Sequence, residues 1–396
     1  DDLGPTWSSL QGAQLTQVTE RWAPWWMDRR ADLLALAQQG PCYVYDRASL
    51  RRAADDLVGL QHVERVFFAM KANPNPAVLR TLAEQGLGIE CVSPGELARV
   101  KEVLPELSAD RILFTPNFAG RQEYVDAMAL GCHVTLDNLH PLEAWPEVFA
   151  GRSVQVRIDP GHGRGHHDHV RTAGARSKFG VSVEQLDRLE QLADQHDVNI
   201  VGLHAHNGSG VLNADNWAEV AVFLAGVARR FPNVRYLDLG GGLGVPERPG
   251  QPSLDLAALD ASLARVRQAY PHLTLWLEPG RYLVAQAGVL LARVTQLKQK
   301  ADLHYIGIET GMNSLIRPAL YGSWHEIVNL SRLDEPATTK ATVVGPICES
   351  GDTLGRDRML PPTVEGDVLL IDVAGAYGRC MSSEYNLREP AREVVV

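Results

Sequence analysis

Short apolar segments recur along the middle of the chain, separated by stretches with the spacing of amphipathic helices. The segment Val66–Met70 is a continuous apolar run, typical of a strand buried on both faces, whereas Pro76–Ala83 places its apolar residues on one helical face. Eight segments predict strands, at residues 66–70, 88–92, 111–115, 133–136, 154–158, 200–206, 235–239 and 273–278. Because strands and helices alternate without a break, and no dinucleotide fingerprint follows the first strand, the pattern favours a closed (β/α)8 barrel over an open doubly wound sheet.

The pattern of hydrophobic and polar residues changes beyond about residue 284, where alternating β segments follow one another with few helical repeats between them. These segments are Leu283–Gln299, His304–Ile308, Lys340–Val344, Asp367–Val373 and Arg392–Val396. They predict a mostly antiparallel β domain, joined by the early strand Cys42–Asp46. We therefore expect an α/β plus β protein: an N-terminal segment (1–46) that gives a strand to the β domain, a barrel (47–284) and a C-terminal β domain (285–396).

Composition narrows the class of protein. The chain has 396 residues, of which 45% are hydrophobic and 22% charged, and this suits a large globular enzyme of about two domains. It holds no apolar run of about eighteen residues, so no membrane span is expected. A net charge of −10 argues against a nucleic-acid partner. Five cysteines without a CxxC spacing predict reduced thiols in a cytoplasmic protein.

The beginning of the chain has two unusual features. It starts with Asp and carries no basic and apolar leader, so we interpret it as a trimmed or excised segment. Trp22, Trp25 and Trp26 then crowd into five residues. They could form a docking patch for a missing domain, but packing on the chain's own core is the preferred interpretation.

The predicted carboxyl ends of the barrel strands carry polar and glycine residues. Barrel enzymes place their chemistry at this face. Lys71 ends an apolar run, where partial desolvation would favour a neutral amine able to form a Schiff base; the alternative is a surface lysine that caps a strand. The triplet Gly240–Gly242 would let backbone N–H groups approach a phosphate. Together they indicate a phosphorylated aldehyde cofactor, pyridoxal 5′-phosphate (PLP). The ends carry Lys71, Ser93, Asn117, Asp137, Asp159, His206, Gly240–Gly242 and Glu278.

Seven segments from about residue 40 onward carry a resemblance to a known family. They are Phe68–Asn73, Ser177–Gly180, His204–Ser209, Gly240–Gly242, Glu278–Arg281, Cys348–Asp352 and Ala376–Gly378. In order and spacing the chain resembles the fold-type III PLP-dependent decarboxylases, which share the alanine racemase-like fold. Among them it most resembles the diaminopimelate decarboxylases, because the segment Met381–Asn386 resembles their C-terminal tail. The segment Ile316–Tyr321 and the N-terminal stretch resemble the decarboxylase part of bifunctional aspartokinase/diaminopimelate decarboxylases, which implies a fused aspartokinase domain.

The resemblance implies roles around the cofactor. Lys71 would hold the PLP aldehyde as a Schiff base and His206 would lie against the pyridine ring, although a satisfied histidine inside a barrel strand is the alternative for His206. Tyr377 would complete the pocket. The phosphate would be bound by Ser209, Gly240, Gly241, Gly242 and Arg281.

Glu278 bears on the type of reaction. A carboxylate beside the pyridine nitrogen keeps that nitrogen protonated, so that the ring can accept the electron pair left by CO2. Alanine racemases have an arginine at this place. Glu278 therefore favours decarboxylation over racemisation.

Proton donation and substrate binding are assigned by the same resemblance. Cys348, beside Glu349 and Asp352, would donate a proton to the carbanion; the alternative is a small buried hydrophobic residue. Substrate binding is implied for Arg281, Arg317, Tyr321, Glu349 and Tyr377. The arginines would bind a distal carboxylate and Glu349 a distal ammonium, whereas an ordinary surface ion pair is the alternative for Arg317.

The resulting expectation is PLP-dependent decarboxylation of meso-2,6-diaminopimelate to L-lysine and CO2, the last step of lysine biosynthesis, in a cytoplasmic homodimer with shared active sites. Alternatives are decarboxylation of ornithine, lysine or carboxynorspermidine, a cofactor-free Schiff-base aldolase, and a catalytically silent homologue acting as a binding module. The family's loop after the third strand is altered here to Thr115–Ala119, which leaves the role of Asn117 open. The histidine-rich stretch Gly161–His169 matches no zinc signature, so no metal is expected.

Overall fold

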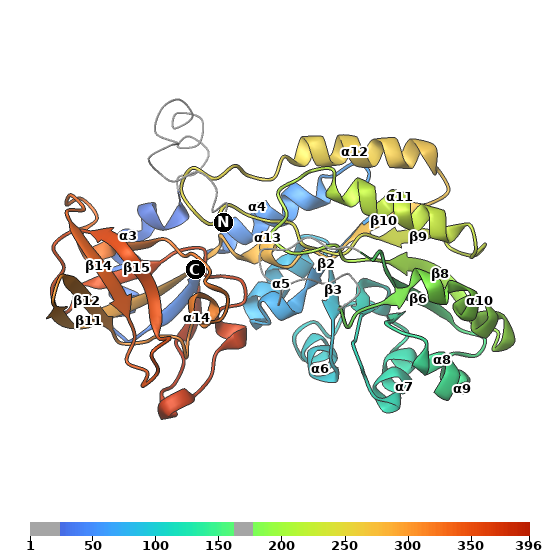
Figure 1. The fold of residues 1–396 in the computed structure, drawn as a ribbon, viewed down its shortest axis with the longest axis horizontal. Coiled ribbons are helices and arrows are strands. Elements are labelled where there is room, and N and C mark those ends of the chain that lie inside the picture. The colour runs from blue at the N-terminus through green and yellow to red at the C-terminus, as the bar shows by residue number, and fades with distance from the viewer. Residues whose placement is uncertain (1–23, 162–176) are drawn as a thin grey trace. The chain divides into compact units, whose positions relative to one another are not determined.

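The computed structural model describes residues 24–161 and 177–396, which divide into two compact units. The barrel unit comprises Leu50–Gly244 and Leu254–Leu283, without the segment 162–176. The β unit comprises the described residues up to Ser49, together with Val245–Ser253 and Val284–Val396. Figure 1 traces both units from the N-terminus to the C-terminus.

Eight parallel strands close the barrel in the order β2, β3, β4, β5, β6, β8, β9 and β10, with β10 pairing back onto β2. The short strand β7 adds to β6. The strands are β2 (Arg65–Ala69), β3 (Gly88–Cys91), β4 (Ile112–Phe114), β5 (His133–Leu136), β6 (Ser153–Asp159), β7 (Val181–Ser182), β8 (Asn199–His204), β9 (Tyr236–Asp238) and β10 (Thr274–Leu277). The predicted (β/α)8 barrel is confirmed.

Helices alternate with these strands (Figure 1). Local signals begin several of them: the side chain of Asn75 accepts hydrogen bonds from the first turn of α5, and Ser93 does the same for α6, each followed by proline. The helices are α4 (Arg47–Val58), α5 (Pro76–Glu84), α6 (Pro94–Val103), α7 (Arg121–Leu130), α8 (His140–Ala144), α9 (Pro146–Phe149), α10 (Leu186–Gln195), α11 (Asn216–Ala228), α12 (Leu256–Ala269) and α13 (Arg281–Val284).

The β unit is built on one sheet in which most neighbouring strands run antiparallel, as predicted. Only the pairs β1–β17 and β12–β14 are parallel. Its strands are β1 (Cys42–Tyr45), β11 (Gly288–Lys300), β12 (Leu303–Ile308), β13 (Ile327–Asn329), β14 (Thr339–Val344), β15 (Thr353–Leu360), β16 (Val368–Ile371) and β17 (Arg392–Val395). The early segment therefore does supply a strand to this sheet.

Two details of the predicted β domain were wrong. Strand β11 begins at Gly288 rather than at Leu283, because α13 and the turn closed by the bond from Ala287 N to the Val284 carbonyl occupy the intervening residues. Strands β13 and β15 were not predicted, since one is short and the other carries charged residues such as Arg356 and Asp357 within an otherwise apolar pattern.

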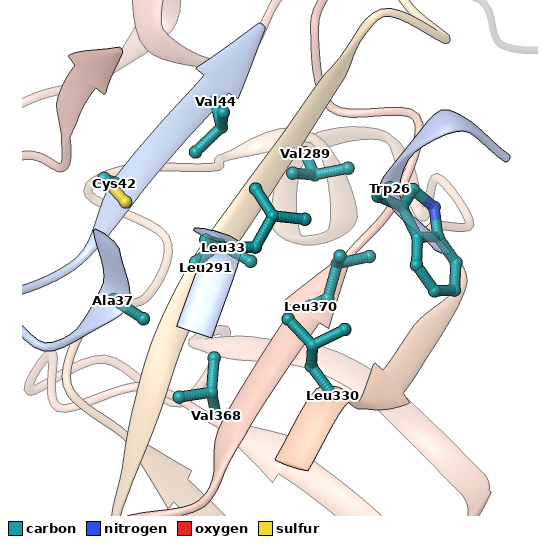
Figure 2. Packing of buried hydrophobic residues seen from close by; sticks show 10 residues of the cluster. All are labelled: Trp26, Leu33, Ala37, Cys42, Val44, Val289, Leu291, Leu330, Val368 and Leu370. Carbon is teal, nitrogen blue, oxygen red and sulfur yellow. The ribbon is translucent and has the colours of Figure 1, made fainter. Parts of the chain in front are cut away.

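The β unit has a core on one face of its sheet. Helix α3 (Arg30–Ala37) buries Leu33 and Ala37 against residues of β1, β11 and β16 (Figure 2). Trp26, in the 3-10 helix η1 (Trp25–Arg29), is 3% exposed within this cluster, and Trp25 packs against it. The two tryptophans thus pack on the chain's own core as preferred, while Trp22 lies outside the described residues.

Short 3-10 helices and one more α-helix complete the described chain. They are η2 (Met70–Ala72), η3 (Ala109–Arg111), η5 (Val183–Gln185), α14 (Arg317–Tyr321), η6 (Leu330–Arg332), η7 (Arg379–Met381) and η8 (Tyr385–Leu387). Within residues 24–161 and 177–396, no helix is both long and apolar enough to cross a bilayer.

Candidate active site

Four of the predicted site segments follow neighbouring strands of the barrel. Lys71 follows β2, Glu278 follows β10, the triplet Gly240–Gly242 follows β9 and His206 follows β8. Because the strands run in the order β2, β10, β9, β8 and are parallel, these residues emerge side by side from one end of the barrel.

Lys71 belongs to the exposed residues of the structure, and the expected partial desolvation of its amine stays a prediction. The lysine lies in the 3-10 turn η2, two residues beyond the end of β2, and the turn buries its neighbours Met70 and Ala72. Burial raises the pKa of Glu278 and of Glu90, and the positive charge of Lys71 opposes that rise in both.

Glu278 is buried and hydrogen-bonded to a histidine that was not predicted as a site residue. Nε2 of His204 lies 3.1 Å from Oε2 of Glu278, and both side chains are less than 10% exposed. Burial lowers the pKa of His204 to about 4, so the ring is neutral near pH 7 and its Nε2–H donates to the carboxylate. The other oxygen, Oε1 of Glu278, is buried and has no hydrogen-bond partner among the described residues.

A second buried carboxyl group, that of Asp238, is hydrogen-bonded to Glu278. Asp238 is fully buried, accepts from Gly240 N (3.0 Å) and Gln155 Nε2 (3.2 Å), and is hydrogen-bonded to Glu278. Burial, and then the neighbouring charge of Glu278, raise the pKa of Asp238 well above its usual range. Asp238 therefore holds a proton that it can donate. That bond opposes the rise that burial causes in the pKa of Glu278 and favours its ionised form.

Further charged groups line the barrel interior. Glu90 accepts a hydrogen bond from Thr115, and Arg157 lies 3.9 Å from Oδ1 of Asp137. Burial raises the pKa of Glu90 and lowers that of Arg157. The side chain of Asn117 bonds to Asp137, which gives that residue a supporting role in this network.

Sequence reasoning did not assign a role to the interior groups His204, Asp238, Glu90 and Arg157. A signal was present, because each charged or polar residue interrupts an otherwise apolar strand segment. In a closed barrel such a side chain either faces the helices or points inward, and burial inside the barrel is costly unless the group is paired.

His206 is fixed by the glycine triplet. Gly241 N donates to His206 Nδ1 at 3.2 Å. The pKa of His206 is held well below its usual range, first by burial and then by the charges of Arg157 and Lys71, so the ring is neutral. The orientation of the His206 ring is therefore set by the backbone that follows β9.

The triplet forms a cradle that only glycine can build. A Cβ atom on Gly241 would lie 2.2 Å from the Glu278 carbonyl oxygen, and one on Gly242 would lie 2.2 Å from that of Gly208. Gly242 also has φ +82°, which favours glycine. Since the amides of Gly240 and Gly241 already donate to Asp238 and His206, Gly242 is the triplet's candidate donor to an anion.

These features fit the cofactor that the sequence resemblance implies. Oε1 of Glu278 is a buried acceptor for a protonated ring nitrogen, the cradle admits a phosphate, and Lys71 supplies an amine. His204, Asp238 and Glu278 also lie close enough together to hold a metal ion, all ligand atoms being within 4.8 Å. Their hydrogen bonds to one another make the group part of the same cofactor site.

The remaining barrel candidates lie near these groups in the chain. Ser209 is half-buried in the loop after β8, and Arg281 is half-buried at the first position of α13. Ser93 caps α6 and Asp159 accepts from Gly161 N, so both shape the backbone. The histidine-rich residues 162–169 lie outside the described part of the chain.

Cys348 lies in an exposed turn of the β unit together with Glu349. Its exposure rules out the alternative of a small buried hydrophobic residue. Cys348 N donates to Asn386 Oδ1 at 2.6 Å, which ties the turn to the tail. Asp352 accepts from Met312 N and Ile347 N, so this carboxylate shapes the turn from inside.

Arg317 is only 5% exposed, which rules out an ordinary surface ion pair. It starts α14, where its Nη2 lies 3.3 Å from Oε1 of Glu247 and its Nη1 lies 3.0 Å from Nε2 of His325. Tyr321 is half-buried at the end of the same helix. Tyr377 is half-buried and has φ +54°, an unusual value for a bulky residue that is typical of functional sites.

Comparisons with known proteins agree with this geometry. Residues 47–285 match the family model described as pyridoxal-dependent decarboxylase, pyridoxal binding domain. The diaminopimelate decarboxylase of Methanothermobacter thermautotrophicus is 38% identical over 92% of this chain and 89% of its own length. A crystal structure of a diaminopimelate decarboxylase superposes with a TM-score of 0.84 at 32% identity, covering 93% of this chain and 91% of that one.

A second solved structure bears on the ligand. The diaminopimelate decarboxylase from Helicobacter pylori complexed with L-lysine superposes with a TM-score of 0.82 at 27% identity, over 90% of this chain and 91% of that one. The family that the sequence motifs indicated is therefore confirmed. The chain belongs to the pyridoxal-dependent decarboxylases, in the family of the diaminopimelate decarboxylases.

Proposed function

We propose that this protein decarboxylates meso-2,6-diaminopimelate to L-lysine and CO2 with pyridoxal 5′-phosphate as cofactor. The observation that carries the proposal is the buried carboxylate of Glu278, held by His204 and Asp238 with one oxygen left for a ring nitrogen, in a chain of this family. The relatives named above and the L-lysine complex support the substrate and the product.

The residues of the barrel unit bind and orient the cofactor. When bound, PLP supplies an aldehyde that captures an amine and a ring that accepts the electron pair released as CO2 leaves. Lys71 provides the resident amine, and Glu278 holds the proton on the ring nitrogen at its Oε1. His206, kept neutral and oriented by Gly241 N, supports the ring face. Gly242, Ser209 and Arg281 bind the phosphate.

Most of the residues that we propose to act on the substrate belong to the β unit, and Arg281 belongs to the barrel unit. Arg317, a buried and oriented guanidinium, binds the distal carboxylate, with Tyr321, Tyr377 and Arg281 assisting. Glu349 faces the distal ammonium. Cys348, whose thiol is exposed, donates the proton that the α-carbon takes up after CO2 has left.

The remaining expectations concern assembly and location. We propose a homodimer that completes the active sites, and exposed apolar side chains on the tail support it: Leu387 is 94% exposed and Tyr385 50%. Five free cysteines support a reducing compartment such as the cytoplasm. A fused aspartokinase domain stays a prediction.

The test is a direct assay. Purified protein, reconstituted with PLP, is given meso-diaminopimelate, and CO2 and L-lysine are measured. We expect both products in equal amounts, with little turnover of ornithine, L-lysine or carboxynorspermidine. Faster turnover of one of those amines would reassign the substrate within the family, and the absence of any decarboxylation would overturn the proposal.

A further inference from the structure

Arg317 is held by a buried histidine that none of the sequence motifs included. His325 lies between α14 and β13 and is 0% exposed. Its Nε2 is 3.0 Å from Nη1 of Arg317. A guanidinium has donors and no acceptor, so Nε2 of His325 must be the acceptor and carries no proton.

The second ring nitrogen has an equally definite role. Nδ1 of His325 lies 2.9 Å from the backbone oxygen of Asp372, which follows β16. A carbonyl oxygen accepts only, so Nδ1 carries the proton. The two contacts together require one tautomer of the neutral imidazole and fix the plane of the ring.

Charged groups from several elements face this histidine. Arg317 comes from α14, and Arg358 of β15 donates to the His325 carbonyl at 2.7 Å. Glu247, in the 245–253 segment, pairs with the far side of Arg317. The carboxyl group of Asp372 accepts from Trp26. A second proton on the ring would remove the acceptor and set two cations against each other at 3.0 Å.

We propose that His325 is a positioning residue for the substrate specificity of this enzyme: as the neutral imidazole it sets the guanidinium of Arg317 to bind the distal carboxylate. The inference rests on the proposed function, since it concerns the residue assigned to that carboxylate. An arginine side chain loses much rotamer freedom when it is fixed, and a buried acceptor provides that order before the substrate arrives. His325 acts on substrate binding and does not touch the reacting atoms.

Two substitutions separate the two bonds of the ring. In His325→Gln the amide oxygen can replace Nε2 as acceptor for Arg317, whereas in His325→Asn the amide nitrogen can replace Nδ1 as donor to Asp372 but no acceptor reaches Arg317. Holoenzyme carrying His325→Asn should show a KM for meso-diaminopimelate raised about tenfold with little change in kcat. His325→Gln should keep a KM close to that of the wild type.

Product-like inhibitors give an independent readout. L-lysine retains the distal carboxylate, so its inhibition constant should rise in His325→Asn in parallel with KM. Cadaverine has no carboxylate, so its inhibition should not change. If both inhibitors weaken equally, the effect lies outside the carboxylate site and the proposal is wrong.

Thermal stability provides the third arm. Lower thermal stability and kcat in His325→Asn without a rise in KM would leave His325 a structural residue and overturn the inference. Should His325→Asn not fold, the comparison of wild type with His325→Gln decides: a raised KM in His325→Gln at a wild-type melting temperature would overturn the inference. An inactive wild type would overturn the proposed function as well, whereas an active wild type with unchanged variants overturns this inference alone.

Discussion

Nε2 of His204 lies 3.1 Å from Oε2 of Glu278 inside the barrel, with His204 neutral and donating. The bond stabilises the ionised form of a carboxyl group whose burial otherwise raises its pKa. An ionised Glu278 would keep the nitrogen of the cofactor ring protonated, so that the ring can accept electrons. His204 therefore supports this chemistry indirectly, through its hydrogen bond to Glu278.

Removing the donor should therefore weaken catalysis at acid pH. In His204→Leu the pKa of Glu278 rises further, so the acid limb of the pH profile of kcat should move upward by about one unit and kcat at neutral pH should fall about tenfold. His204→Gln, which can still donate, should restore most of both. An unchanged acid limb in His204→Leu would show that the bond does not tune Glu278.

Lys71→Ala should abolish the yellow absorbance of the PLP adduct and lower kcat by about a thousandfold or more, because the resident amine is lost. Lys101→Ala, which removes an exposed lysine of α6, is the matched control and should behave like the wild type. Absorbance spectra and a decarboxylation assay measure both. A variant at position 71 that stays yellow and active would remove the central assignment.

Cys348→Ala should keep its cofactor spectrum while kcat drops by about a hundredfold, because the thiol is the proposed proton donor. Cys380 is the other exposed cysteine, and Cys380→Ala should retain activity. The measurements are PLP titration and steady-state rates. Equal rates in the two variants would assign proton donation to another group.

Gly241→Ala should weaken PLP binding by tenfold or more, since the new Cβ would press on the Glu278 carbonyl at 2.2 Å and shift the end of β10. Gly226, inside α11, has no atom within 4 Å of such a Cβ, so Gly226→Ala should leave binding unchanged and stabilise the helix by about 1 kcal/mol. Equilibrium dialysis of PLP and thermal unfolding report the two effects. Unaltered PLP affinity in Gly241→Ala would argue against the cradle.

Trp26→Phe should destabilise the β unit in a pH-dependent way. The indole Nε1 donates to Oδ2 of Asp372 at 3.0 Å, and burial raises the pKa of that carboxyl group to about 6. Because the pKa of Asp372 is raised in the folded protein, its contribution to the free energy of unfolding falls as pH rises from about 4 to 6. The hydrogen bond from the Trp26 indole lowers this pKa and so limits the fall. The substitution should cost about 2 kcal/mol above pH 6 and clearly less near pH 5.

Trp25 offers the control for this experiment, because its Nε1 donates to a neutral acceptor, the Gln286 carbonyl, at 3.2 Å. Trp25→Phe should therefore lower the melting temperature by the same amount at both pH values. If the destabilisation caused by Trp26→Phe is also independent of pH, the hydrogen bond from Trp26 to Asp372 does not contribute to the stability in the expected way.

Much of the site could be predicted because its residues carry short-range signals. Lys71, the glycine triplet and Glu278 stand directly after apolar strand segments, and a parallel barrel must gather such ends on one face. The exposure of Lys71 could not be predicted in this way, since it depends on a 3-10 turn of three residues. Likewise the start of β11 depends on the short helix α13, in which Leu283 and Val284 are as apolar as the residues of a strand.

The sequence by itself determined the βα alternation, the β domain, the packing of Trp25 and Trp26 and the family, because apolar periodicity and local motifs are encoded over a few neighbouring residues. Only the tertiary structure decided which interior groups share protons and which hold a site residue in place. His204 and Asp238 end two barrel strands and Glu278 directly follows a third, and Arg317, His325 and Asp372 meet from separate segments of the β unit. Such partners are chosen by chain closure and burial, since a buried polar group must find its hydrogen bonds among whatever the fold brings beside it.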